Sequence, residues 1–211
     1  MSISDKLASS LGRRDEVPNQ ELAKEIVAAN DAHAIDELIA FISSGSKGIR
    51  ADVIKTLYEV GFENPELIAS HAKTFLALLD SNDNRLQWGA MMALSTLAKL
   101  KHKQVYAALP KILDAAKQGS VITRDHTVKI LATLASMKAY ADEVYPLLID
   151  EVRHAPLNQF PMYAEYALEV TTDKNRTLLL KAINGRMHEV ERDSMRKRLM
   201  KVIKKLEKTT A

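Results

Sequence analysis

The 211-residue sequence contains no cysteine, which excludes disulfides, thiolate zinc sites and cysteine nucleophiles. It is also poor in glycine and proline, with seven and six residues respectively, a composition typical of helices. No apolar run approaches the ~18 residues that a membrane-spanning helix needs. The N-terminal stretch MSISDKLASSLGRRDE carries charges where a secretion signal would be apolar. We therefore expect a cytoplasmic protein with no membrane span.

Motifs for catalysis or phosphate binding are missing as well. The GxSxG, GxGxxG and P-loop patterns do not occur. The six histidines are scattered, with no pair spaced four residues apart and no HExxH. Apolar residues nevertheless make up 46% of the chain, enough to fill the core of one domain or at most two. We predict no catalytic residue, no metal site and no cofactor, so the chain is not expected to be an enzyme.

An internal repeat dominates the sequence. The segments Ile49–Gly61, Leu86–Ala98 and Thr123–Ala135 begin 37 residues apart, and the same step leads to Phe160. Small or apolar residues recur at positions one, five, eight, nine and twelve of each segment. This spacing predicts a helix that buries one face.

The segments between these helices repeat with the same period. Each is amphipathic, and each is followed by a turn residue at the 37-residue spacing: Gly45, Asn82, Gly119 and Pro156. Asp83 or Asn84 and Ser120 are placed to cap the helix that follows. The pattern predicts a row of helical hairpins.

The predicted fold class is therefore all-α, a right-handed α-solenoid of about five helical hairpins with a period near 37 residues. Four copies are clear, and a degenerate fifth comprises Arg176–Gly185 and Glu191–Glu207. An additional helix, Gln20–Ala29, precedes the array. We expect residues 1–18 to form a flexible N-terminal segment and residues 19–211 to form a single domain.

The paired helices resemble HEAT and HEAT-like repeats. The segment SNDNRLQWGAMMALSTLA is similar to the second helix of that family, and Pro110 and Pro146 lie inside first helices, as the family often shows. The resemblance covers roughly residues 31–207. It implies an interaction scaffold, because HEAT-like proteins are mostly scaffolds, with minorities acting as alkylpurine DNA glycosylases or bilin lyases.

The second helices of the repeats carry the candidate binding residues. In many solenoids one helix of each pair lines the concave surface that binds partners, and repeat positions three, seven and ten avoid the core stripe. Aromatic, methionine and lysine side chains at these positions suit a binding surface for a protein or peptide partner. The candidates are Lys55, Tyr58, Trp88, Met92, Lys129, Met162 and Tyr166. For Trp88, packing between adjacent repeats is the alternative.

A basic segment at the C-terminus is the second candidate surface. Residues 186–208 contain nine basic and four acidic side chains, a net charge of +5, whereas the whole chain carries +3. Four lysines fall on one face of the last helix: Lys197, Lys201, Lys204 and Lys208. A polar cap of the array explains them, and contact with nucleic acid or an anionic membrane is the alternative.

A DNA-binding protein of the alkylpurine-glycosylase type is the second functional hypothesis. In it, Lys55, Lys129 and the C-terminal lysines would contact phosphate, while Trp88 and Tyr166 would stack on bases. The sequence lacks the aspartate that this resemblance requires near an aromatic residue, because Met92 stands one turn after Trp88. Nucleic acid is therefore a possible partner but not the favoured one.

Overall fold

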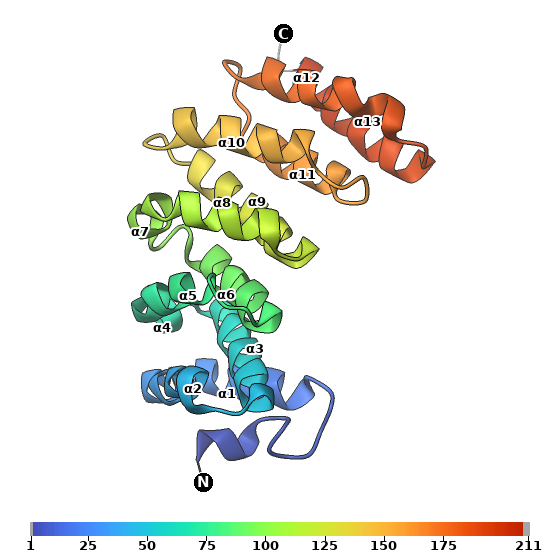
Figure 1. The fold of residues 1–211 in the computed structure, drawn as a ribbon. Coiled ribbons are helices and arrows are strands. Elements are labelled where there is room, and N and C mark those ends of the chain that lie inside the picture. The colour runs from blue at the N-terminus through green and yellow to red at the C-terminus, as the bar shows by residue number, and fades with distance from the viewer. Residues whose placement is uncertain (1, 209–211) are drawn as a thin grey trace. The chain divides into compact units, whose positions relative to one another are not determined.

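The structure, a computed structural model, describes residues 2–208 (Figure 1). All regular secondary structure in this range is helical, and no strand occurs in it. The chain divides into two compact units, Met1–Thr127 and Val128–Ala211. The single domain expected over residues 19–211 stays a prediction.

The first unit contains the N-terminal helices and three of the repeated second helices. Its elements are η1 (Ile3–Lys6), α1 (Val17–Ala29), α2 (Ala32–Ser44), α3 (Lys47–Glu63), α4 (Pro65–Ile68), η2 (Ala69–His71), α5 (Ala72–Leu78), α6 (Asn84–Leu97), α7 (His102–Ala107), α8 (Leu109–Gln118) and the first part of α9 (Val121–Ala135). Helix α3 lies against α1 and α2 on one side and against α6 on another (Figure 1). It is the central helix of this unit.

The predicted repeat frame matches the helices. The second-helix segments correspond to α3, α6, α9 and α11 (Phe160–Glu169), and all four predicted turn residues lie between helices. Asp83 caps α6 through Oδ1, which accepts a hydrogen bond from the Arg85 amide at 3.0 Å. The Ser120 hydroxyl accepts one from the Thr123 amide at 3.3 Å at the start of α9. Both predicted caps are confirmed.

The described part of the N-terminal segment makes defined contacts, whereas the flexibility expected for residues 1–18 stays a prediction. Within its described part, η1 forms, α1 begins already at Val17, and Leu7 is fully buried. The fully buried Asn19 links this segment to α3. Its Oδ1 accepts a hydrogen bond from the Ala8 amide at 3.0 Å, and its Nδ2 donates one to Asp52 Oδ1 at 2.8 Å. A polar side chain buried with both its amide groups bonded stabilises the segment against α3, and no repeat pattern signals it.

Helices α3 and α6 approach each other closely because of one glycine. A Cβ atom on Gly89 would lie 2.6 Å from Ile54 Cγ1, closer than two such atoms can pack. The absence of a side chain at Gly89 therefore lets α6 settle against α3. This contact brings Trp88, the neighbour of Gly89, next to the α3 face.

The second unit contains the last two hairpins. Its elements are the rest of α9, α10 (Ala141–Arg153), α11, α12 (Arg176–Arg186), η3 (Met187–Glu189) and α13 (Asp193–Lys208). Helix α13 packs on α11 and α12. It buries Leu199, Val202, Ile203 and Leu206, as its apolar spacing predicts, whereas Met195 is only partly buried.

Candidate functional site

Three aromatic side chains on α3 and α6 form what we call the aromatic strip: Tyr58, Phe62 and Trp88. Tyr58 and Phe62 are four residues apart, so they share one face of α3. Their rings meet edge to face with centroids 5.9 Å apart, and the Tyr58 and Trp88 rings lie 6.0 Å apart at a tilt of 46°. Both separations fall in the range of favourable aromatic pairs. The strip therefore runs continuously from α6 across α3.

Two cations lie over the rings of the strip. The Arg85 guanidinium carbon is 4.3 Å from the centroid of Trp88, one turn along α6. The Lys55 ammonium is 4.9 Å from the centroid of Tyr58, one turn along α3. Cations within about 6 Å of a ring face are attracted by its electron-rich surface. These contacts hold both rings in place.

The two cations are neutralised by two carboxylates. Lys55 Nζ lies 2.5 Å from Glu59 Oε1 and 2.9 Å from Glu16 Oε2. The other oxygen of Glu16 pairs with Arg85. Glu16 stands just before α1, so a residue from outside the repeats links α3 to α6. With two positive and two negative side chains, the cluster carries no net charge.

The ionisation equilibria follow these contacts. Burial disfavours the charged form of Lys55, but hydrogen bonds to Glu59 and Glu16 outweigh it and raise the pKa of this ammonium. Burial likewise disfavours the Glu16 carboxylate, but Arg85 and Lys55 outweigh it and lower its pKa below 4.5. Burial raises the pKa of the Tyr58 hydroxyl. Lys55 and Glu16 are therefore both charged at neutral pH.

Two predicted surface residues are in fact buried. Lys55 is 5% exposed and Tyr58 is 3% exposed: Glu16 pairs with Lys55, and the rings of Trp88 and Phe62 lie against Tyr58. The prediction that these two side chains contact a partner directly is therefore wrong. Trp88 and Met92 are partly exposed, and Phe62, which the sequence analysis did not select, is 46% exposed.

The other three predicted surface residues lie in the second unit. Lys129 is on α9, and Met162 and Tyr166 are one turn apart on α11; all three are partly exposed. They form a set of their own, and their role as binding residues stays a prediction. The four lysines on α13 are all exposed, as the helix register predicts.

A serine and a histidine meet beside the strip. Ser95 Oγ lies 2.8 Å from His126 Nδ1, and the His126 and Phe62 rings are 6.1 Å apart. The same hydroxyl donates to the Met92 carbonyl at 2.7 Å. The Ser95 hydroxyl therefore has two partners, and whether it donates to His126 Nδ1 or accepts from it depends on the tautomer of the imidazole.

Sequence reasoning missed several members of this site. Phe62 and Arg85 could have been found, because each is three or four residues from a selected aromatic on the same helix face. Glu16 has no such signal, because it lies 69 residues before Arg85 in the sequence. Among the described residues, no three His, Asp or Glu side chains converge in a way that could hold a metal ion. No helix in the described range is both long and apolar enough to cross a membrane.

No protein-family model matches the chain, and no curated protein matches it in sequence. Solved structures do match its fold. A designed armadillo repeat protein in complex with the peptide (KR)4 has a TM-score of 0.66 at 14% identity, covering 88% of this chain and 85% of its own.

Further designed proteins show the same likeness. Computationally designed armadillo repeat proteins for modular peptide recognition reach a TM-score of 0.66 at 12% identity, covering 96% of this chain and 97% of their own. An engineered protein reaches 0.63 at 17% identity, covering 98% of this chain and 99% of its own. These matches confirm an all-α helical-repeat solenoid. They are armadillo-type repeats, so the likeness is to solenoids in general and not specifically to the HEAT kind.

Proposed function

We propose that this chain is a non-enzymatic helical-repeat scaffold of the HEAT-like kind. It binds a protein or peptide partner over the exposed edge of the aromatic strip, where Phe62, Trp88 and Met92 reach the surface. Lys55 and Tyr58 have a supporting role beneath that surface. The observation that carries the proposal is an aromatic strip whose rings contact paired charges, with Lys55 buried, and which reaches the surface at Phe62 and Trp88.

The exposure and rigidity of these side chains support a binding role. Large apolar side chains are ordinarily covered, and partly exposed Trp and Phe in a fixed arrangement bury much area on binding at little entropic cost. Designed helical-repeat proteins with the same fold bind peptides. The charged cluster of Lys55, Arg85, Glu16 and Glu59 that contacts the strip is electrically neutral. The strip therefore favours a partner with apolar side chains.

The DNA-binding alternative has less support. It requires Lys55 to reach a phosphate, but this side chain is almost completely buried and lies between two carboxylates. Arg85 pairs with Glu16. Both cations of the strip are thus already paired with carboxylates and are not available to neutralise nucleic-acid phosphates, whose contacts supply much of the affinity for such ligands.

Selection of peptides on the full chain tests the proposal. Peptides enriched from a random displayed library are titrated calorimetrically into the wild type and into Phe62→Ala and Trp88→Ala. Each substitution removes an aromatic contact at the centre of the proposed surface. We expect each to weaken binding at least about tenfold, as hot-spot truncations do.

Leu100→Ala is the matched control, because Leu100 is an apolar side chain with 43% exposure that follows α6 outside the strip. It should leave the affinity unchanged. Peptides whose binding survives both aromatic substitutions would show that the strip is not the binding surface.

A further inference from the structure

One residue from outside the repeats reaches both cations of the aromatic strip. Glu16 stands just before α1; its Oε2 lies 2.9 Å from Lys55 Nζ, and its Oε1 pairs with Arg85. Lys55 lies over the ring of Tyr58, and Arg85 lies over the ring of Trp88. Each ring is therefore linked to the Glu16 carboxylate through one intervening cation.

The two links differ in how much they depend on Glu16. Lys55 has a second carboxylate partner, because Glu59 Oε1 lies 2.5 Å from its Nζ. Arg85 has no second carboxylate partner among residues 2–208, and its buried Nε has no hydrogen-bond partner there. Without Glu16, Lys55 would still be held by Glu59, whereas the Arg85 guanidinium would keep only its contact with the indole ring.

Trp88 is the ring for which this difference matters. It is partly exposed and belongs to the proposed binding surface, whereas Tyr58 is 3% exposed and contacts the rings on either side of it. A partly exposed indole can change rotamer, and a long arginine side chain that is free to turn into water does not hold it. A carboxylate that keeps the guanidinium over the ring leaves fewer arrangements to be frozen when a ligand binds.

The position of Glu16 is set by the fold of the N-terminal segment and not by the strip. Its carbonyl oxygen accepts a hydrogen bond from the Gln20 amide at 3.1 Å, in the first turn of α1, and α1 packs against α3. The segment before α1 is tied to α3 as well, because the Ser9 amide donates to Asp52 Oδ2 at 2.7 Å. The carboxylate is therefore placed at the strip by contacts that exist without a ligand.

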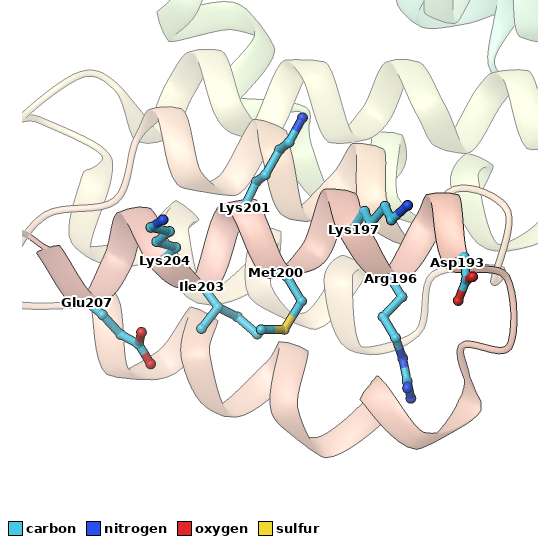
Figure 2. Close-up of a pocket in the computed structure, with 8 residues that line it drawn as sticks. All are labelled: Asp193, Arg196, Lys197, Met200, Lys201, Ile203, Lys204 and Glu207. Atoms are coloured by element: carbon cyan, nitrogen blue, oxygen red, sulfur yellow. The ribbon is translucent and has the colours of Figure 1, made fainter.

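The outer face of α13 offers no comparable arrangement. Of the eight side chains that line it in Figure 2, six are charged and none is aromatic. The cations of this face have no ring among these side chains to position. The link from a carboxylate through a cation to an exposed ring is thus a feature of the strip and not of this second charged face.

We propose that Glu16 is a positioning residue of the binding surface. It keeps Arg85 stacked on Trp88 and so presents the indole to the partner in one orientation. The segment that precedes α1 is therefore part of the binding site, although Glu16 acts through Arg85 and need not touch the partner. This inference rests on the proposed function, and one of its tests needs no ligand.

Calorimetric titration of variants of the whole chain tests the effect on affinity. The probe is the tightest of the peptides selected on the wild type, made synthetically. Glu16→Ala should weaken its binding about fivefold, the cost of ordering one long side chain on binding. Glu25→Ala is the matched control and should leave the affinity unchanged. Glu25 is a carboxylate of α1 that pairs with Lys6 at 2.6 Å, and neither residue belongs to the strip.

A double-mutant cycle tests whether Glu16 acts through Arg85. Arg85→Met keeps the aliphatic stem but removes the guanidinium, and it should weaken the peptide by about the same factor. Glu16→Ala added to Arg85→Met should have little further effect, less than about twofold, because the two residues act as one unit. Added to Lys55→Met, in contrast, Glu16→Ala should still weaken binding about fivefold, because the link to Trp88 does not pass through Lys55.

Trp88 provides the measurement that needs no ligand. It is the only tryptophan in the chain, so the decay of tryptophan fluorescence anisotropy reports the nanosecond motion of this one indole. In the folded protein without peptide, the fast component of the decay should grow in Glu16→Ala and in Arg85→Met. It should match the wild type in Glu25→Ala. A loss of stability alone leaves this signal unchanged, because it is measured on the folded state.

Failure of Glu16 as a positioning residue can be told apart from failure of the strip as a binding surface. If Phe62→Ala and Trp88→Ala weaken the peptide but Glu16→Ala does not, the strip binds the peptide and Glu16 does not position it. An unchanged anisotropy decay in Glu16→Ala, or equal penalties for this substitution with and without Arg85→Met, would overturn the proposal too. If Phe62→Ala and Trp88→Ala leave the affinity unchanged, the proposed function fails, and the anisotropy decay still decides whether Glu16 positions Trp88.

Discussion

The aromatic strip and the lysine-bearing face of α13 differ in how their charged side chains are paired. Beneath the strip, Lys55 and Arg85 are paired with Glu16 and Glu59, so no net charge is offered to a ligand. On the outer face of α13, by contrast, four lysines are exposed: Lys197, Lys201, Lys204 and Lys208. In the aromatic strip the paired charges lie against the rings, whereas on α13 the lysines are exposed to solvent.

This difference arises from how the helices are covered. Helix α3 packs against α1, and Glu16, just before α1, supplies a carboxylate to Lys55. The outer face of α13 has no such cover within the described part of the second unit. A repeat protein can thus obtain two distinct surfaces from similar amphipathic helices. Substitutions that alter burial or charge on either surface test this comparison.

The largest effect should come from a charge placed on the inner face of α13. Leu199 is fully buried, so Leu199→Asp should destabilise the protein by several kcal/mol, on the order of 3 or more, because a carboxylate would replace a packed apolar group. Met200→Asp, one residue away on the exposed side, should change stability by no more than about 0.5 kcal/mol. Denaturant unfolding of both variants measures the contrast, and similar losses for the two would contradict the assignment of faces.

A smaller loss is expected when the buried cation of the strip is removed. Lys55→Met keeps the aliphatic stem but leaves Glu59 and part of Glu16 unpaired. We expect a loss of about 2 kcal/mol in the free energy of unfolding, because charged hydrogen bonds are broken in a protected site. The matched change Lys201→Met on α13 should cost less than about 0.5 kcal/mol. Equal costs would mean that the strip's cation is not protected from solvent.

Glu16 should make stability depend on pH in the acidic range. Its folded-state pKa is lowered below 4.5, so its contribution is present above that value and is lost as pH falls through the folded-state pKa. Because the side chain is 44% exposed, screening limits this contribution to about 1 kcal/mol or less. The wild type should exceed Glu16→Gln in stability near pH ~7, and the gap should close toward pH ~3. Urea unfolding of both proteins across this range measures it, and a gap independent of pH would exclude this origin.

The smallest effects should come from the exposed lysines of α13. Lys201→Ala and Lys204→Ala should each change the free energy of unfolding by about 0–1 kcal/mol, since isolated surface charges contribute little. Thermal unfolding of these variants would reveal any larger loss. A larger loss would mean that these lysines stabilise α13 as the cap of the array, and it would contradict the prediction that they are isolated surface charges.

The fold was largely predictable because a repeated backbone pattern leaves a repeated sequence pattern. The helices α3, α6, α9 and α11 and their preceding turns lie where the 37-residue frame places them. Helix rotation was predictable for Trp88, which is partly exposed. It was wrong for Lys55 and Tyr58, at positions seven and ten of the frame, although Met92 at position seven of the next copy is partly exposed.

The failures share a physical cause. Lys55 pairs with Glu16 and α3 packs against α1, and both Glu16 and α1 precede the repeats and have no counterpart in the frame. Contacts between segments far apart in sequence, such as Asn19 with Asp52, follow from packing and not from periodicity. A frame derived from the repeats alone predicts the same exposure for corresponding residues of α3 and of the later second helices. It misses that α3 alone has α1 as an additional neighbour.

The central claim, that the aromatic strip is a partner-binding surface, can be tested through Trp88, the only tryptophan in the chain. Its fluorescence reports whether the strip becomes covered when a selected peptide is added. The account predicts a shift of the emission to shorter wavelength that saturates with the calorimetric affinity. A peptide that binds tightly while the Trp88 emission stays unchanged would contradict it.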